Sequence, residues 1–362
     1  MIKHRKLVLD TFCEVHDLLK PWADEIFWNF EEHIAAGKFI PGAIYLIGRR
    51  QFHINVATIR QLVDQAHIIL SNPAEGSDTL RTHCNDIWNV GDLAHSNKLL
   101  LIGGGDMDNS WTCLQYDSFL PKILDYRENI EESSRVEKIY NKTEKPYKFL
   151  FLNGRSRSHR RYLINKFTTL GLLEKSIWSN LDTRNGPINY LDPKYEVDQY
   201  SKNVNSISVE NFVKHDLFNN EWGEIYLKAD PYIDTYFSLV TETVFNYPYS
   251  FRTEKIWKPI AMGHPFIAVA NQGYYRDLHK LGFQTFGHLI DESFDQIENN
   301  YDRLERIAKV VEDLCQQDLD KFLKECYNIC KYNQQHLAEM SIRVQQEFPD
   351  RFHQFINSHF NE

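Results

Sequence analysis

A run of basic residues directly follows an apolar segment that has the composition of a buried strand. The apolar segment is Lys148–Gly154, and the basic run is Asn153–Arg161, with the letters NGRSRSHRR. Cations in the first turns of a helix oppose the helix dipole, so a bound anion that offsets them is expected. A helix N-terminus offers free N–H groups, and guanidinium groups donate bidentately to phosphate oxygens. We predict that Arg155 and Arg157 bind phosphate; the alternative is a solvated basic helix start.

A second cluster of polar residues lies at the expected start of another helix, Thr253-Glu254-Lys255. Threonine is a favourable N-cap residue, and an acidic residue in the first turn suits the dipole, whereas a lysine there does not. A carboxylate that accepts from both ribose hydroxyls and an ammonium that meets a pyrophosphate would explain the pair. The alternative is a capped helix whose Glu254 and Lys255 side chains lie in solvent.

The segments FSLVTET (237–243) and FRTEKIWKPIAMGHPFI (251–267) resemble the donor-binding signature of the α-1,3-fucosyltransferases. In that family a strand ending in a Phe-Glu-Asn-Ser-like turn leads to Asp-Tyr-x-Thr-Glu-Lys at a helix start. The resemblance implies a GT-B glycosyltransferase in which Glu254 holds the ribose of a nucleotide sugar and Lys255 its diphosphate. It further implies that Arg155 or Arg157 contacts the diphosphate, and it matches Glu242 to the glutamate of the turn. Glu242 and Thr253 are therefore also expected to belong to the donor site.

The resemblance implies a nucleoside-diphosphate sugar as donor without fixing its base. Ser250 and Phe251 stand where the family has Asp-Tyr, and Thr243 replaces the Asn of the turn. A GDP-linked or a UDP-linked sugar is therefore expected, with no metal and no other cofactor. Aromatic residues near the motif, which could stack on a base or sugar but whose spacing favours the core, are Phe251, Trp257, Tyr274 and Tyr275.

The loop GGGDMDN (103–109) follows the apolar run KLLLI and carries Asp106 and Asp108. In a GT-B enzyme one of these carboxylates would be the general base that deprotonates an acceptor hydroxyl. In the GT-A architecture the same spacing holds a divalent metal against the donor phosphates. A polar turn without catalytic function is a further alternative. Other candidates for the base are Glu75, Asp92 and His95.

Short apolar runs alternate with amphipathic stretches along the chain, which predicts an α/β fold with parallel sheets. An amphipathic helix is expected within Thr11–Gly37, begun or broken at Pro21 and ended at Gly37. The charged stretch Arg127–Lys148 suggests a surface helix and then a linker, and the α/β alternation restarts after it. We therefore expect an N-terminal Rossmann-like acceptor domain over 1–145 and a C-terminal Rossmann-like donor domain over 146–345. The two would face a central cleft, as in GT-B enzymes, and a helical tail would follow over 346–362.

The composition excludes several classes of protein. The 362 residues include 41 Lys and Arg against 50 Asp and Glu, a net charge of −9, which argues against a general nucleic-acid binder. Six scattered cysteines are too few for a disulfide framework, and Cys326, Cys330 and His336 fall short of a zinc site. No apolar stretch reaches the roughly 20 residues that a membrane span needs. A cytoplasmic protein without a transmembrane segment is expected.

Three functions follow from these patterns. The first is a GT-B glycosyltransferase that moves a sugar from a nucleoside diphosphate to an acceptor hydroxyl, with inversion and without metal. The second is a non-catalytic module that binds a nucleotide or a glycan. The third is a metal-dependent GT-A-type transferase that uses Asp106 and Asp108. The acceptor stays open among a glycan, a protein side chain and a modified base in DNA.

Overall fold

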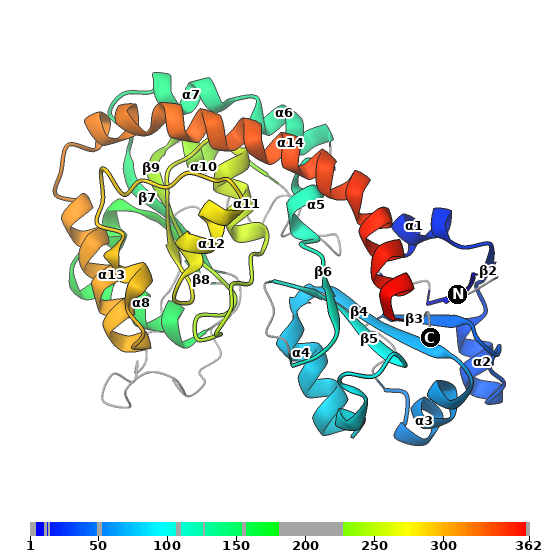
Figure 1. The fold of residues 1–362 in the computed structure, drawn as a ribbon. Coiled ribbons are helices and arrows are strands. Elements are labelled where there is room, and N and C mark those ends of the chain that lie inside the picture. The colour runs from blue at the N-terminus through cyan, green and yellow to red at the C-terminus, as the bar shows by residue number, and fades with distance from the viewer. Residues whose placement is uncertain are drawn as a thin grey trace. The chain divides into compact units, whose positions relative to one another are not determined.

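The computed structural model of the chain contains two compact units (Figure 1). Unit 1 comprises Met1–Ser118 and Ile342–Glu362, and unit 2 comprises Phe119–Ser341. In each unit the described strands form one parallel sheet, so the predicted α/β fold class is confirmed. The structure describes residues 5–10, 13, 15–48, 53–105, 110–125, 127–153, 157–180 and 227–359.

The sheet of unit 1 has six strands in the order β2-β1-β3-β4-β5-β6. Their bounds are β1 Lys6–Leu9, β2 Glu25–Phe27, β3 Ile44–Gly48, β4 His67–Gly76, β5 Leu99–Gly104 and β6 Cys113–Gln115. Both faces of the central strands are buried, because successive side chains point to opposite faces and both sets are apolar. Between Asn72 and Gly76 the register of β4 against β5 shifts, so Pro73–Glu75 bulge out of the ladder.

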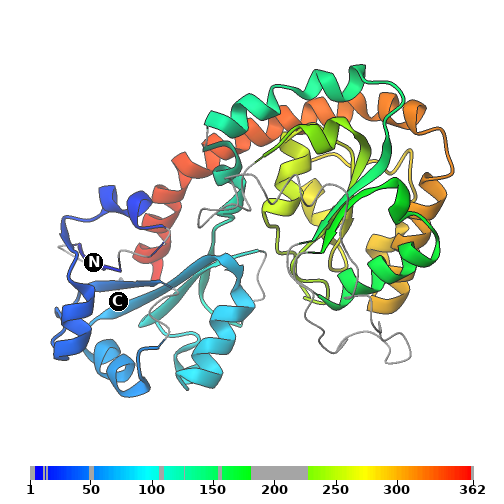
Figure 2. The ribbon, with the colours of Figure 1, turned by 180° about the vertical axis from the view of Figure 1, so that it is seen from behind.

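Helices cover the two faces of this sheet. One face packs against α2 (Phe30–Ala36), α3 (Val56–Gln65), α4 (Ser77–Thr82) and the π-helical turn η3 (His83–Ile87). The other face packs against the 3-10 turn η1 (Lys20–Trp22) and the last part of α14, through Phe348, Phe352 and Ile356. Figures 1 and 2 show this end of α14 on the side of the sheet opposite α2 and α3.

The N-terminal segment expected to be an amphipathic helix divides into shorter elements. It contains α1 (His16–Leu19), η1, β2 and α2. The helix prediction is wrong for Glu25–Phe27, which pairs with β1 as an edge strand. Pro21 lies in η1, and pairing with β1 overrides the helical spacing of the apolar residues. Gly37 ends α2 in the left-handed region, with φ of 61°, as predicted.

The sheet of unit 2 has four strands in the order β10-β9-β7-β8. They are β7 Tyr147–Asn153, β8 Ile177–Asn180, β9 Thr235–Thr241 and β10 Phe266–Val269. Phe149 and Phe237 stack across neighbouring strands with ring centroids 5.5 Å apart, and Phe167 packs edge-on against Phe149. The aromatic residues near the Thr-Glu-Lys motif, expected to favour the core, are indeed buried: Phe251, Trp257, Tyr274 and Tyr275.

The helices of unit 2 surround this sheet. The loops after β7, β9 and β10 lead into α8 (Ser158–Thr169), α11 (Glu254–Ala261) and α12 (Tyr274–Lys280). The remaining elements are α5 Phe119–Asp125, α6 Arg127–Ser133, α7 Val136–Asn141, η5 Leu173–Lys175, α10 Asp230–Ile233, η10 Ser293–Gln296, α13 Asn300–Leu314 and α14 Leu319–His359. Unit 1 also contains the short 3-10 turn η4 (Gly91–Leu93).

The units divide at other places than the predicted domains. The charged segment Arg127–Lys148, expected to be a surface helix and then a linker, begins with the helices α6 and α7, which belong to unit 2. Asn129 explains this, because its fully buried amide donates to Ile123 O and accepts from Leu227 N within unit 2. The expected tail from residue 346 is helical, but it continues α14, whose residues from Ile342 belong to unit 1.

Two features bear on the expected class of protein. Among the described helices, including α14 with its 41 residues, none combines the length and the apolar character that crossing a membrane requires. All six cysteines are free thiols, and five of them are buried. The chain therefore holds its fold without disulfides.

His264, two residues before β10, makes unit 2 sensitive to acid. The ring is buried, with Nε2 donating to Thr235 O at 3.0 Å and Nδ1 accepting from Ser238 Oγ at 2.9 Å. Burial lowers the pKa of His264 to about 3. Since the unfolded chain has an ordinary histidine pKa near 6.5, it binds the proton more readily, so stability falls as pH drops from about 6.5 towards 3.

We expect the wild type to lose about 1.4 kcal/mol of stability per pH unit below about 6.5 from this group alone. Urea unfolding between pH 7 and 4.5, compared with His264→Gln, isolates the contribution, because all other titrating groups are shared. The wild-type curve should fall more steeply than that of the variant. Parallel curves would contradict a neutral buried imidazole.

Candidate functional site

Two of the predicted site segments meet at one edge of the unit 2 sheet. Strands β7 and β9 are parallel neighbours, so their carboxyl ends lie at the same edge. The helix after β7 is α8, and the helix after β9 is α11. In open parallel sheets, ligands bind outside the carboxyl ends of the strands, where helix N-termini direct free N–H groups.

Glu242, the first residue after β9, fixes the start of α11 from inside the protein. Its side chain is fully buried. Thr253 donates to it through its backbone N at 3.2 Å and its Oγ1 at 2.6 Å, and Tyr274 donates its hydroxyl at 2.8 Å. Thr253 and Tyr274 thus engage both oxygens of Glu242, a predicted donor-site residue, and the carboxylate positions the start of α11.

Thr253 is the N-cap of α11, as its sequence context predicts. Its hydroxyl accepts from Lys255 N at 3.4 Å while donating to Glu242. The same hydroxyl accepts from Lys255 Nζ at 3.2 Å. Because Thr253 is buried and Glu242 is buried behind it, the first turn of α11 has a fixed position relative to β9.

Glu254 and Lys255 form an ion pair at this fixed turn. Lys255 Nζ lies 2.6 Å from Glu254 Oε1 and 3.3 Å from Thr243 Oγ1, and its side chain is 24% exposed. Burial by itself raises the pKa of Glu254, but Lys255 and Lys258 outweigh it and hold that pKa below its usual value. Glu254 is thus an ionised acceptor at neutral pH, next to a partly exposed ammonium group.

The basic run after β7 divides into exposed and buried members. Arg157 is the exposed N-cap residue of α8, and its side chain makes no capping hydrogen bond. Arg155 lies outside the described residues. Arg160 and Arg161 are buried, and Arg160 Nη2 donates to Thr241 O at 2.8 Å and Glu242 O at 3.2 Å. The Arg160 guanidinium at this helix start therefore binds backbone carbonyls at the end of β9 rather than an anion.

His159 holds the same loop from the neighbouring position. Its Nε2 donates to Glu242 O at 2.9 Å, and its ring stacks on Phe245 with centroids 5.3 Å apart. Burial, reinforced by the Arg160 guanidinium, holds the pKa of His159 well below its usual value. The ring is neutral and acts as a structural donor, a role that the sequence did not predict.

Arg303 of α13 also stabilises the loop after β9, and its role was not predicted from the sequence. Its guanidinium is buried, donates to Phe245 O at 2.8 Å and Ala270 O at 3.2 Å, and lies 4.4 Å from the Phe245 ring centroid. Burial lowers its pKa to about 10, so it stays charged at neutral pH. The sequence feature that could have indicated this role is an arginine beside Leu304 on the buried side of an amphipathic helix.

Asn153, the last residue of β7, lies at the same edge with an unusual environment. Its Oδ1 accepts from Thr241 Oγ1 at 2.6 Å, which links the ends of β7 and β9. Its Nδ2 is buried and has no hydrogen-bond partner in the part of the chain that the structure describes. An unpaired buried donor costs about 1–3 kcal/mol, and such costs concentrate at functional sites.

No protein family, curated protein or solved structure matches this chain. The edge of the unit 2 sheet offers a buried positioning carboxylate, a capped helix start, an exposed arginine, and an ion pair of the buried Glu254 with the partly exposed Lys255.

The candidates for a general base lie in unit 1 and have different environments. Asp106 and Asp108 lie outside the described residues, directly after Gly105, which has a φ of 80°. Asp92 is exposed and accepts from both Nη atoms of Arg60, at 2.6 and 2.7 Å, and this pairing lowers its pKa. Its geometry is that of a surface ion pair.

The remaining rivals are Glu75 and His95. Glu75 lies in the bulge of β4 at the carboxyl end of that strand, whereas His95 is exposed on the loop after η4. In the described part of the chain, no three His, Cys, Asp or Glu side chains converge in a geometry suited to a metal.

Proposed function

We propose that the protein is an inverting, metal-independent GT-B glycosyltransferase whose donor site lies at the carboxyl edge of the unit 2 sheet. The observation that carries the proposal is the Glu254–Lys255 pair in the first turn of α11, held in place by Thr253 and the buried Glu242. An ionised carboxylate and an ammonium group at a rigid helix start complement the hydroxyls and the diphosphate of a nucleotide sugar.

Each group has a defined part in donor binding. Glu254 accepts hydrogen bonds from the two ribose hydroxyls, because an ionised carboxylate has acceptor sites for both. Lys255 turns from Glu254 to the diphosphate, a change that its partly exposed side chain allows. Arg157, exposed at the start of α8, supplies a second cation. Arg155 has the same proposed role.

In the proposed reaction an acceptor hydroxyl oxygen forms a bond to the anomeric carbon of the sugar while the bond to the diphosphate oxygen breaks. The electron pair goes to the leaving diphosphate, and the hydroxyl proton goes to Asp106 or Asp108. Lys255 and the arginines stabilise the charge that develops on the diphosphate, which lowers the barrier. The donor sugar, GDP- or UDP-linked, is the only small molecule required besides the acceptor.

A thermal-shift screen against GDP, UDP, CDP, ADP and dTDP in EDTA tests the donor site. A ligand that binds only the folded state raises the melting temperature by mass action. One diphosphate should stabilise the wild type, and Lys255→Ala should weaken its binding by about 10- to 100-fold, the size of a lost charged hydrogen bond. Lys309→Ala removes an exposed ammonium from α13, outside the site, and should leave the shift unchanged.

The screen separates the alternatives as well. Stabilisation that appears only with Mg²⁺ or Mn²⁺ and persists in Lys255→Ala would contradict the proposal and favour a metal site at Asp106 and Asp108. Binding in EDTA without release of the diphosphate from any nucleotide sugar, with or without acceptor, would favour a non-catalytic binding module. No stabilisation by any diphosphate would exclude the donor site altogether.

A further inference from the structure

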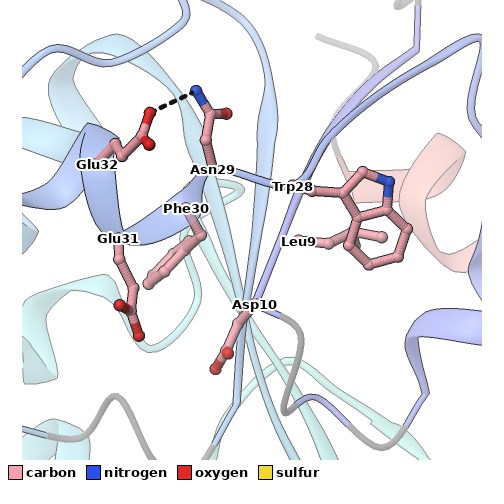
Figure 3. Close-up of a pocket in the computed structure, with 7 residues that line it drawn as sticks. All are labelled: Leu9, Asp10, Trp28, Asn29, Phe30, Glu31 and Glu32. Carbon is pink, nitrogen blue, oxygen red and sulfur yellow. Dashed lines mark hydrogen bonds between the residues drawn. The ribbon is translucent and has the colours of Figure 1, made fainter.

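Unit 1 contains a pocket of about 330 Å³ at the carboxyl ends of β1 and β2. A volume of this size is at the small end of ligand pockets, which suits a single ring rather than an extended cofactor. Figure 3 shows the residues that line it: Leu9, Asp10, Trp28, Asn29, Phe30, Glu31 and Glu32.

Three side chains of this lining are carboxylates, which accept hydrogen bonds. Asp10 is buried, and its Oδ2 accepts from Gly48 N at 3.0 Å, so its carboxylate has a fixed position. Glu31 is exposed in the first turn of α2, and Figure 3 shows its carboxylate and that of Asp10 pointing the same way. Glu32 turns towards Asn29, whose Nδ2 lies 3.4 Å from Glu32 Oε2. The lining includes no lysine or arginine.

Trp28 supplies an aromatic wall. It is 46% exposed, a large fraction for a tryptophan, whose burial would otherwise stabilise the fold. The ammonium group of Lys20 lies 4.9 Å from the centroid of the indole ring, so this ring already has one cation–π contact. Trp28 thus contributes an apolar plane to the lining, and the fixed Asp10 and the exposed Glu31 contribute hydrogen-bond acceptors.

We propose that this pocket binds one sugar ring that carries hydroxyl or ammonium groups and no negative charge. The C–H face of the ring packs on Trp28, and its hydroxyl or ammonium groups donate to Asp10 and Glu31. A carboxylate or phosphate on the ligand would be repelled by the same side chains. That the bound ring is the acceptor rests on the proposed transferase function, whereas the binding itself does not.

Binding of glucosamine, methyl β-glucoside and glucuronate, followed by ligand-observed NMR saturation transfer and thermal shift, tests this pocket. The pocket predicts signals from glucosamine and methyl β-glucoside, and at least tenfold weaker binding of glucuronate. Trp28→Ala should abolish the signals. Glu31→Gln should reduce the preference for glucosamine over glucuronate by about fivefold, the size of one exposed charge interaction.

Asp64→Asn is the matched control, since it removes one exposed carboxylate from α3, outside the lining. It should leave all three affinities unchanged. The inference is overturned if neither glucosamine nor methyl β-glucoside binds, if Trp28→Ala binds them normally, or if glucuronate binds as tightly as glucosamine. The nucleoside-diphosphate shift, measured on the same wild-type sample, reports on unit 2, so failure of the sugar pocket is distinct from failure of the donor site.

Discussion

Glu242→Ala is expected to lower the melting temperature of unit 2 by about 10 °C. The substitution leaves Thr253 N, Thr253 Oγ1 and Tyr274 Oη, which now donate to the carboxylate, without a buried acceptor. Removing one partner of a buried charged network costs about 3–5 kcal/mol, and 1 kcal/mol shifts the melting temperature by about 2–4 °C in a unit of this size. Differential scanning calorimetry measures the change.

Two further variants make this prediction specific. Glu242→Gln keeps the shape and one acceptor oxygen, so its loss should be less than half that of Glu242→Ala. Glu174→Ala removes an exposed carboxylate of η5 and should shift the melting temperature by less than 2 °C, since surface substitutions are usually within about 0.5 kcal/mol. A loss below 3 °C for Glu242→Ala would show that the carboxylate does not hold α11 in place.

Arg303→Leu is expected to have an effect of similar size through a different set of contacts. The guanidinium donates to Ile297 O at 2.8 Å and Glu298 O at 3.2 Å, in addition to Phe245 O and Ala270 O. Leucine leaves these carbonyls without their donor, and each buried acceptor left unpaired costs about 1–3 kcal/mol. Chemical unfolding in urea should show a loss of at least about 3 kcal/mol.

Arg303→Lys distinguishes charge from geometry. Lysine restores the charge, but its single ammonium group has three donors and cannot span carbonyls on both the β9 and the β10 loops. We expect it to recover less than half of the loss. If Arg303→Lys were as stable as the wild type, the fork of the guanidinium would be unnecessary, and the account of the loop would be wrong.

The local features of unit 2 were largely predictable from the sequence. The strand ends before the basic run and before the Thr-Glu-Lys motif follow from apolar runs, and the Thr253 cap follows from its residue type. The roles of His159 and Arg303 were not predictable, because their partners lie far along the chain. Arg303 reaches Phe245, which is 58 residues away. A contact over this separation leaves no periodic pattern of apolar residues in the sequence.

The division of the chain into units depends on contacts of the same kind. The charged segment Arg127–Lys148 has the composition of a surface helix and a linker, and one buried asparagine, Asn129, binds it to a residue 98 positions away. In the N-terminal segment, the residues Leu7–Leu9 are too few to predict a strand by themselves. Their neighbours in the sheet, β2 and β3, make them the core of unit 1.

The central claim is that Lys255 binds the diphosphate of a nucleotide, and isothermal titration calorimetry tests it most directly. The nucleoside diphosphate that stabilises the wild type most is titrated in EDTA alongside its monophosphate, into the wild type and into Lys255→Ala. The account predicts that the wild type binds the diphosphate at least tenfold more tightly than the monophosphate, and that this preference disappears in Lys255→Ala. Equal affinities in the wild type, or a preference that survives the substitution, would contradict it.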